Sequence, residues 1–165
     1  MVKSGPAKSN REAPVRRMGS ALAAMALALL LASGAASAAV FDGTEGNDTL
    51  KGAVLADTLR GFGGDDAMFG LGGPDRLVGG PGVDTMRGNA AADSMYGGED
   101  GDFMIGGAGR DHVYGGPGDD SISTIKDDAV DFVDCGPGLD YYDQSLSVGG
   151  PDQNDVYVNC EIEIS

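Results

Sequence analysis

Apolar side chains recur at every ninth residue through the middle of the chain. In frames of nine counted from Gly43 to Ser123, the eighth position is always apolar: Leu50, Leu59, Met68, Leu77, Met86, Met95, Met104, Val113 and Ile122. One inward side chain between two outward ones predicts a strand of three residues. Such strands at a fixed spacing predict an all-β repeat fold.

The rest of each frame is also regular. Position one is Gly in all nine frames: Gly43, Gly52, Gly61, Gly70, Gly79, Gly88, Gly97, Gly106 and Gly115. Position six is Asp in all nine: Asp48, Asp57, Asp66, Asp75, Asp84, Asp93, Asp102, Asp111 and Asp120. The Gly-rich half permits positive φ and predicts a tight turn. A disordered Gly-rich segment would show a biased composition, but its residues would not recur at fixed positions of a nine-residue frame. Two repeats therefore form one coil, and stacked coils form two parallel sheets.

This arrangement places like charges together. Aspartates two repeats apart lie on one edge about 4.8 Å apart, where two carboxylates repel by about 3.5 kcal/mol. Burying one Leu or Met offsets only about 2 kcal/mol, and the chain has no Trp and few aromatic residues for a larger core. A cation between turns would reverse the balance. Carboxylate and main-chain carbonyl oxygens are hard ligands that suit Ca²⁺.

The frames resemble the nonapeptide GGxGxDxUx of the repeat-in-toxin (RTX, hemolysin-type) calcium-binding proteins. The segments Gly79–Arg87, Gly106–Tyr114 and Gly115–Ser123 match it at every defining position, and the resemblance covers residues 43–123. It implies a parallel β-roll, a right-handed β-solenoid of nine repeats, with several Ca²⁺ ions held between turns. It also implies a ligand role for the nine position-six aspartates.

Position four departs from Gly at Leu55, Ala91 and Asp100. Two of these departures fall in even-numbered repeats, whose turns share one edge, and Asp tolerates the left-handed conformation better than Leu or Ala. We therefore expect the odd-numbered repeats to form the tighter row of sites, which comprises Asp48, Asp66, Asp84, Asp102 and Asp120.

Residues 1–38 have the pattern of a secretory signal peptide, with a basic start, an apolar run from Ala21 to Leu31 and small residues before a cleavage site after Ala38 or Ala39. The alternative, a membrane anchor, needs about 20 strongly apolar residues. Both the general and the twin-arginine export routes stay open. The processed chain would carry a net charge of 6 − 25 = −19. That charge disfavours nucleic acid and anionic lipid and favours cations. We expect a secreted, single-domain protein with a β-roll over 39–123.

The C-terminal segment 124–165 has a different pattern. After a frame slip, Cys135–Tyr142 resembles a further modified turn, and Asp140 is a possible additional ligand. Alternation of apolar residues over 156–164 predicts one half-buried strand with Cys160 on its apolar face. In an oxidising compartment, a disulfide between Cys135 and Cys160 would fasten this strand as a cap; two free thiols are the alternative.

The sequence contains no catalytic motif, and His112, its one histidine, is expected on the outer surface. The sequence therefore predicts a non-enzymatic, secreted calcium-binding protein that folds on binding Ca²⁺. An extracellular adhesion or matrix protein with a cell-surface partner is the alternative, and a hydrolase with an unrecognised site is the weakest interpretation. Val78, Tyr96 and Tyr114 are expected to form an outward ladder, which stabilises neighbouring strands or binds such a partner.

Overall fold

The computed structural model describes residues 37–125, 127, 129–143 and 154–164. Most of the predicted signal peptide lies outside these residues. The strands are β1 (Val40–Asp42), β2 (Thr49–Lys51), β3 (Thr58–Arg60), β4 (Ala67–Gly72), β5 (Arg76–Pro81), β6 (Thr85–Ala90), β7 (Ser94–Glu99), β8 (Phe103–Ala108), β9 (His112–Tyr114), β10 (Ser121–Ser123), β11 (Phe132–Asp134), β12 (Tyr141–Asp143), β13 (Val156–Val158) and β14 (Ile162–Ile164).

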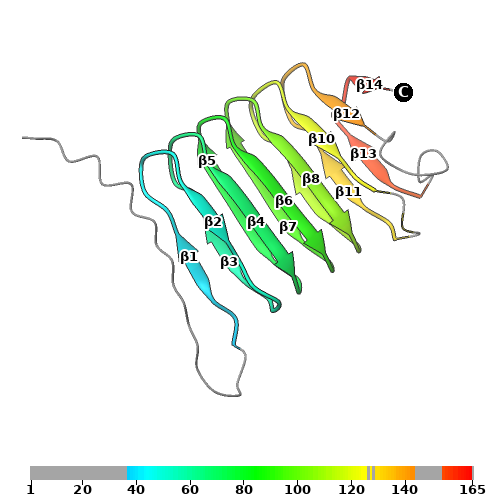
Figure 1. The fold of residues 1–165 in the computed structure, drawn as a ribbon. Coiled ribbons are helices and arrows are strands. Elements are labelled where there is room, and N and C mark those ends of the chain that lie inside the picture. Colours follow the sequence, from blue (N-terminus) through cyan, green and yellow to red (C-terminus); the bar gives the residue numbers. More distant parts are fainter. Residues whose placement is uncertain (1–36, 126, 128, 144–153, 165) are drawn as a thin grey trace, which may run out of the picture.

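The strands form two parallel sheets of seven that lie face to face (Figure 1). One sheet has the order β1-β3-β5-β7-β9-β11-β13, and the other has the order β14-β12-β10-β8-β6-β4-β2. Consecutive strands thus alternate between the sheets, as expected when each repeat contributes a turn and a strand. The predicted parallel β-roll is confirmed. No helix in the described part of the chain has the length and hydrophobicity of a membrane span.

The core is a column of position-eight side chains between the sheets. All nine are buried, from Leu50 at 8% exposure to several at 0%, and the column continues through Val133 and Cys135. Each side chain stacks on its equivalent in the next coil, as in the pairs Leu77↔Met95 and Met86↔Met104. Each repeat therefore contributes one side chain to the core, and that side chain makes most of its contacts with neighbouring coils.

The C-terminal segment differs from the predicted single strand. It forms β13 and β14 in opposite sheets, separated at Asn159, which has a φ of 55°. The inward and outward positions of β13 are also the reverse of those predicted. Val156 and Val158 are 46% and 37% exposed, while Tyr157 packs against the core. The reason is register: Tyr157 pairs with the buried Val133 and so takes the inward position.

The predicted disulfide is present and closes the C-terminal end of the roll. Cys135 and Cys160 are bonded with a Cα–Cα distance of 5.2 Å. Cys135 begins the turn before β12, and Cys160 lies in the corner between β13 and β14. The bond therefore joins two successive turns on one edge, rather than fastening one face of a strand.

Candidate metal sites in the turns

The position-six aspartates form two rows, one along each edge of the roll. The first row follows the odd-numbered repeats, and the second row follows the even-numbered repeats. Within a row, the main-chain N–H of each aspartate donates to Oδ1 of the aspartate one coil further on. These N–O distances are 2.7 to 2.8 Å in the pairs Asp48–Asp66, Asp66–Asp84, Asp84–Asp102, Asp102–Asp120, Asp57–Asp75, Asp75–Asp93 and Asp93–Asp111.

Both rows continue beyond the ninth repeat. Asp120 donates its main-chain N–H to Asp140 in the first row, at 2.9 Å. Asp111 donates to Asp131 in the second row, at 2.8 Å. Asp140 was predicted as a possible further member, but Asp131 was not predicted. The signal for Asp131 was the DFVD sequence at 131–134, which fits the second half of a repeat preceded by two extra residues.

Most of these carboxylates keep one buried oxygen without a hydrogen-bond partner. The residues concerned are Asp66, Asp75, Asp84, Asp93, Asp102, Asp111, Asp120, Asp131 and Asp140, each at most 3% exposed and each with an unpartnered Oδ2. An anionic oxygen removed from water without a partner is costly. These oxygens are therefore the atoms that a cation or a proton would satisfy.

The first two repeats differ from the others. Oδ2 of Asp48 accepts the main-chain N–H of Thr44 at 2.6 Å, and Oδ2 of Asp57 accepts that of Ala53 at 2.7 Å. Neither Thr44 nor Ala53 has a positive φ, whereas the equivalent residues Phe62 and later do. In each of these two turns, the carboxylate therefore accepts a hydrogen bond from the main chain of its own repeat. The structure thus places Asp48 and Asp57 in the rows but gives them a different local environment.

The buried carboxyl groups have raised pKa values. Burial raises the pKa of Asp84 to about 6 and that of Asp93 to about 7, and the neighbouring carboxylates one coil away add to the effect. Hydrogen bonds from Asp66 and Asp75, respectively, oppose it. The pKa values of Asp102 and Asp111 are likewise about 7. Without a counter-ion, these carboxyl groups would therefore keep their protons to a higher pH than an exposed aspartate does.

The Gly-rich turns bring main-chain carbonyl oxygens close to the next coil. A Cβ atom on Gly80 would lie 1.9 Å from the carbonyl oxygen of Phe62, and one on Gly98 would lie 2.0 Å from that of Gly80. Both glycines have a positive φ, of 123° and 139°. A side chain is therefore excluded at these positions, where turn carbonyls stack from coil to coil.

The departures at position four are accommodated unequally. Ala91 and Asp100 adopt the left-handed conformation, with φ values of 83° and 73°, but Leu55 does not. The turn containing Ala91 thus keeps the regular backbone despite its side chain. The backbone conformation of the turns differs between the first two repeats and the later ones, and not between the two edges. That the odd-numbered repeats bind calcium more tightly stays a prediction.

These donors fit a hard cation that accepts main-chain ligands. Among the described residues, no three acidic, His or Cys side chains form a complete metal-binding group. An ion between two turns would therefore combine carboxylate oxygens with turn carbonyls. Flexible coordination by six to eight oxygens is the preference of Ca²⁺.

The outer face of the first sheet carries the predicted ladder. The rings of Tyr96 and Tyr114 stack with centroids 5.0 Å apart, and the Arg76 guanidinium lies 4.3 Å from the Tyr96 centroid. Phe132 extends the ladder at 5.8 Å from Tyr114. His112 is exposed, as predicted. Because the rings contact one another across strands, their arrangement supports a stabilising role.

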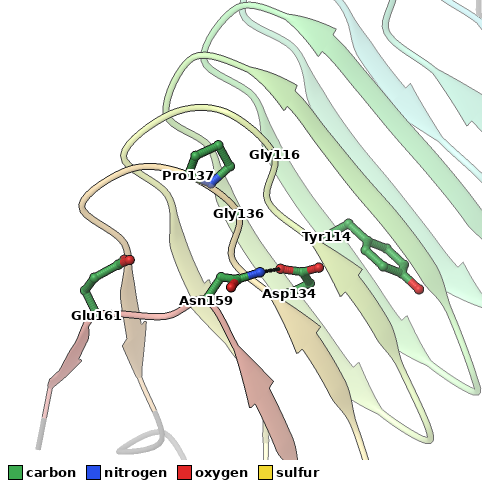
Figure 2. A pocket seen from close by; sticks show the side chains of 7 residues that line it. All are labelled: Tyr114, Gly116, Asp134, Gly136, Pro137, Asn159 and Glu161. Carbon is green, nitrogen blue, oxygen red and sulfur yellow. Dashed lines mark hydrogen bonds between the residues drawn. The ribbon is translucent and has the colours of Figure 1, made fainter.

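A cleft of about 530 Å³ lies at the C-terminal end of the first edge, lined by Tyr114, Gly116, Asp134, Gly136, Pro137, Asn159 and Glu161 (Figure 2). The amide of Asn159 donates to Oδ1 of Asp134 at 2.8 Å. None of the position-six aspartates lines this cleft. It is therefore distinct from the two rows.

The chain also matches a known family. The model of the RTX calcium-binding nonapeptide repeat (four copies) matches residues 42–77, 69–104 and 96–124, which together span just over half of the chain. The comparisons with curated proteins and with solved structures found no significant match. With its nine-residue period, its two parallel sheets and its rows of buried aspartates, the chain belongs to the family of RTX calcium-binding nonapeptide repeat proteins.

Proposed function

We propose that this protein is a secreted, non-enzymatic calcium-binding protein whose β-roll is stabilised by Ca²⁺ ions between successive turns. The repeat family supports calcium binding. The observation that carries the proposal is the set of buried Oδ2 atoms without partners along both edges.

In the folded chain, hydrogen bonds to the neighbouring coil orient the aspartate side chains. Asp84, for example, is 0% exposed and receives the N–H of Asp66 on Oδ1, which holds its Oδ2 in the turn. Bound Ca²⁺ would supply positive charge to these oxygens and to the neighbouring turn carbonyls. The aspartates from Asp66 to Asp120 supply the carboxylates, and we include Asp48 and Asp57 as weaker members because their Oδ2 atoms already have partners.

Coupling of the ion to folding follows from the narrow core. Repulsion of about 3.5 kcal/mol between carboxylates one strand spacing apart exceeds the roughly 2 kcal/mol gained by burying one position-eight side chain. The chain is therefore expected to lose its β-roll at neutral pH when calcium is removed.

The test is far-UV circular dichroism of the chain in millimolar calcium and in excess EGTA, with isothermal calorimetry to count ions. We expect the sheet signal and a cooperative melt in calcium and loss of both in EGTA. Magnesium at the same concentration is the control and should restore little structure, because Mg²⁺ requires a stricter octahedral geometry. Equal sheet content and melting temperature with and without calcium would refute the proposal.

The proposed secretion is tested separately. It is supported by the signal-like residues 1–38 and by the disulfide, which is typical of oxidising compartments. N-terminal sequencing of protein recovered from the culture medium should begin at Ala39 or Val40. Recovery of the intact chain inside the cell alone would contradict secretion but not calcium binding.

A further inference from the structure

We propose that the cleft at the C-terminal end of the first edge binds a neutral carbohydrate, such as one hexose unit of an extracellular glycan. Its volume of about 530 Å³ lies within the range of about 300 to 1,000 Å³ that is typical of small-molecule sites. The segment matched to the repeat family ends at residue 124, and most of the lining lies beyond it: Asp134, Gly136, Pro137, Asn159 and Glu161. The inference goes beyond the proposed function, because none of the position-six aspartates lines the cleft.

The disulfide joins two walls of this cleft. Four lining residues are the sequence neighbours of the bonded cysteines, namely Asp134 and Gly136 beside Cys135, and Asn159 and Glu161 beside Cys160. The Cα atoms of the two cysteines are 5.2 Å apart. The main-chain N–H of Gly116 donates to the carbonyl oxygen of Cys135 at 3.1 Å, which ties the turn of the preceding coil to the same wall. The cleft is therefore formed in the folded chain, and a ligand need not order it on binding.

A hydrogen-bonded pair of side chains supplies the polar groups of the cleft. The amide of Asn159 donates one N–H to Oδ1 of Asp134 at 2.8 Å, and Figure 2 shows this pair with Tyr114 on one side and Glu161 on the other. Among the described residues, the second N–H and Oδ1 of Asn159 and Oδ2 of Asp134 have no hydrogen-bond partner. A donor and two acceptors are thus held close together. Neighbouring hydroxyl groups of a sugar ring each donate and accept, so they complement such a set.

Apolar surface borders these polar groups. Tyr114 is half-buried, and its ring stacks on that of Tyr96 with centroids 5.0 Å apart, which restrains the ring. The exposed ring of Pro137 also lines the cleft. The C–H groups of a pyranose ring can pack against such rings while its hydroxyl groups reach polar side chains. An aromatic ring with a polar tip is suited to a ligand of this mixed character.

The charge of the lining selects among possible ligands. Asp134 and Glu161 are acidic, and no lysine or arginine in the described part of the chain forms an ion pair with either. Oε2 of Glu161 accepts the main-chain N–H of Asp140 at 3.3 Å, which leaves its other oxygen for a ligand. Uronates and sulfated sugars would be repelled. An alkylammonium or guanidinium ion would match the carboxylates but has no acceptor for the amide N–H of Asn159, so a neutral polyhydroxylated ligand matches the whole set better.

The experiment is an NMR titration of the ¹⁵N-labelled, disulfide-bonded protein in millimolar calcium. The probes are the methyl glycosides of glucose, mannose and galactose, and N-acetylglucosamine, with glucuronate and L-argininamide for comparison. We expect saturable shifts of the main-chain N–H signals of Gly116 and Gly136 with at least one neutral sugar and none with glucuronate. The signal of Gly80, which lies two coils away from Gly116, should not move. Saturable shifts with L-argininamide and with none of the neutral sugars would overturn the proposal in favour of an organic cation.

Two matched pairs of variants locate the binding. Tyr114→Ala and Tyr96→Ala each remove half of the same ring stack, but of the two residues only Tyr114 lines the cleft. The affinity for the sugar that binds the parent chain should fall about tenfold or more in Tyr114→Ala and less than about twofold in Tyr96→Ala. Asp134→Ala and Asp42→Ala each remove one carboxylate from the outer face of the first sheet without touching the ladder, and only Asp134→Ala should lose binding.

Two results would overturn the carbohydrate site. One is equal sugar affinity in Asp134→Ala and Asp42→Ala. The other is the absence of shifts at Gly116 and Gly136 with every neutral sugar while the parent chain keeps its sheet signal by circular dichroism. Neither result would bear on calcium binding by the two rows of aspartates.

Discussion

Replacing Asp84 with Asn should change the stability of the roll in opposite directions with and without calcium. Burial raises the pKa of Asp84 from its ordinary value of 3.8 to about 6. A folded-state pKa above the unfolded value means that this group's stabilisation is complete below pH 4 and is lost as the pH rises through about 6. At pH 7.5, ionised Asp84 therefore costs the calcium-free fold about 3 kcal/mol.

Asn cannot ionise, and its amide oxygen still accepts the N–H of Asp66, which is 2.8 Å from Oδ1 of Asp84 in the parent chain. Its buried amide nitrogen costs about 1 kcal/mol, so the net gain without calcium is about 2 kcal/mol. With calcium present, the same change removes a charged ligand and should lower both the melting temperature and the affinity.

The assay is circular dichroism at pH 7.5: sheet content is compared in EGTA, where the parent chain is expected to lose its roll and the variant to regain part of it, and thermal unfolding is compared in millimolar calcium. Glu99→Gln makes the same change in charge at an exposed position and controls for a general reduction of net charge. No gain of sheet content by Asp84→Asn over the parent chain in EGTA, or equal behaviour of the two variants in both buffers, would refute the reasoning.

Three further outcomes are expected. In EGTA, sheet content should be highest near pH 4 and should fall as the pH rises through 6 to 7, because the buried aspartates then ionise. Calcium should abolish this pH dependence. A sheet signal that rises with pH in EGTA would contradict the expectation. Gly98→Ala should destabilise the calcium-bound roll by about 3 kcal/mol or more in chemical denaturation, because the added Cβ would lie 2.0 Å from the carbonyl oxygen of Gly80 at a φ of 139°. Gly72→Ala, whose Cβ would lie 3.7 Å from the nearest atom, should change stability by no more than about 1 kcal/mol. Cys160→Ser should cost about 3 kcal/mol in the same assay, given the sequence separation of 25 between the bonded cysteines. Unchanged stability would show that the C-terminal end is held without the bond.

The regular part of the fold was predictable because a single nine-residue period encodes turn, strand and core position together. The parallel sheets, the buried position-eight residues and the Cys135–Cys160 bond all followed from that pattern and from compartment chemistry. The turn before Asp131 escaped prediction because Thr124 stands where Gly is expected and two extra residues break the frame.

Other details depend on the neighbouring coil and not on local sequence. Thr44 and Ala53 lack a positive φ, whereas the bulkier Phe62 and Leu71 adopt one. Residue preference alone would predict little difference among these four. The first two repeats lie at the end of the stack, so their turns pack against a coil on one side only. Pairing of β13 with β11 likewise determines that Val156 and Val158 lie on the outer face.

The register of the strands is insensitive to the length of the turns between them. Equivalent aspartates are 18 residues apart in the regular coils, but 20 separate Asp111 from Asp131 and 24 separate Asp131 from Asp155, and the strands still pair in parallel. The second edge beyond β10 is thus a natural place to graft a foreign peptide, such as an epitope or an enzyme recognition sequence, onto a scaffold whose pitch stays constant.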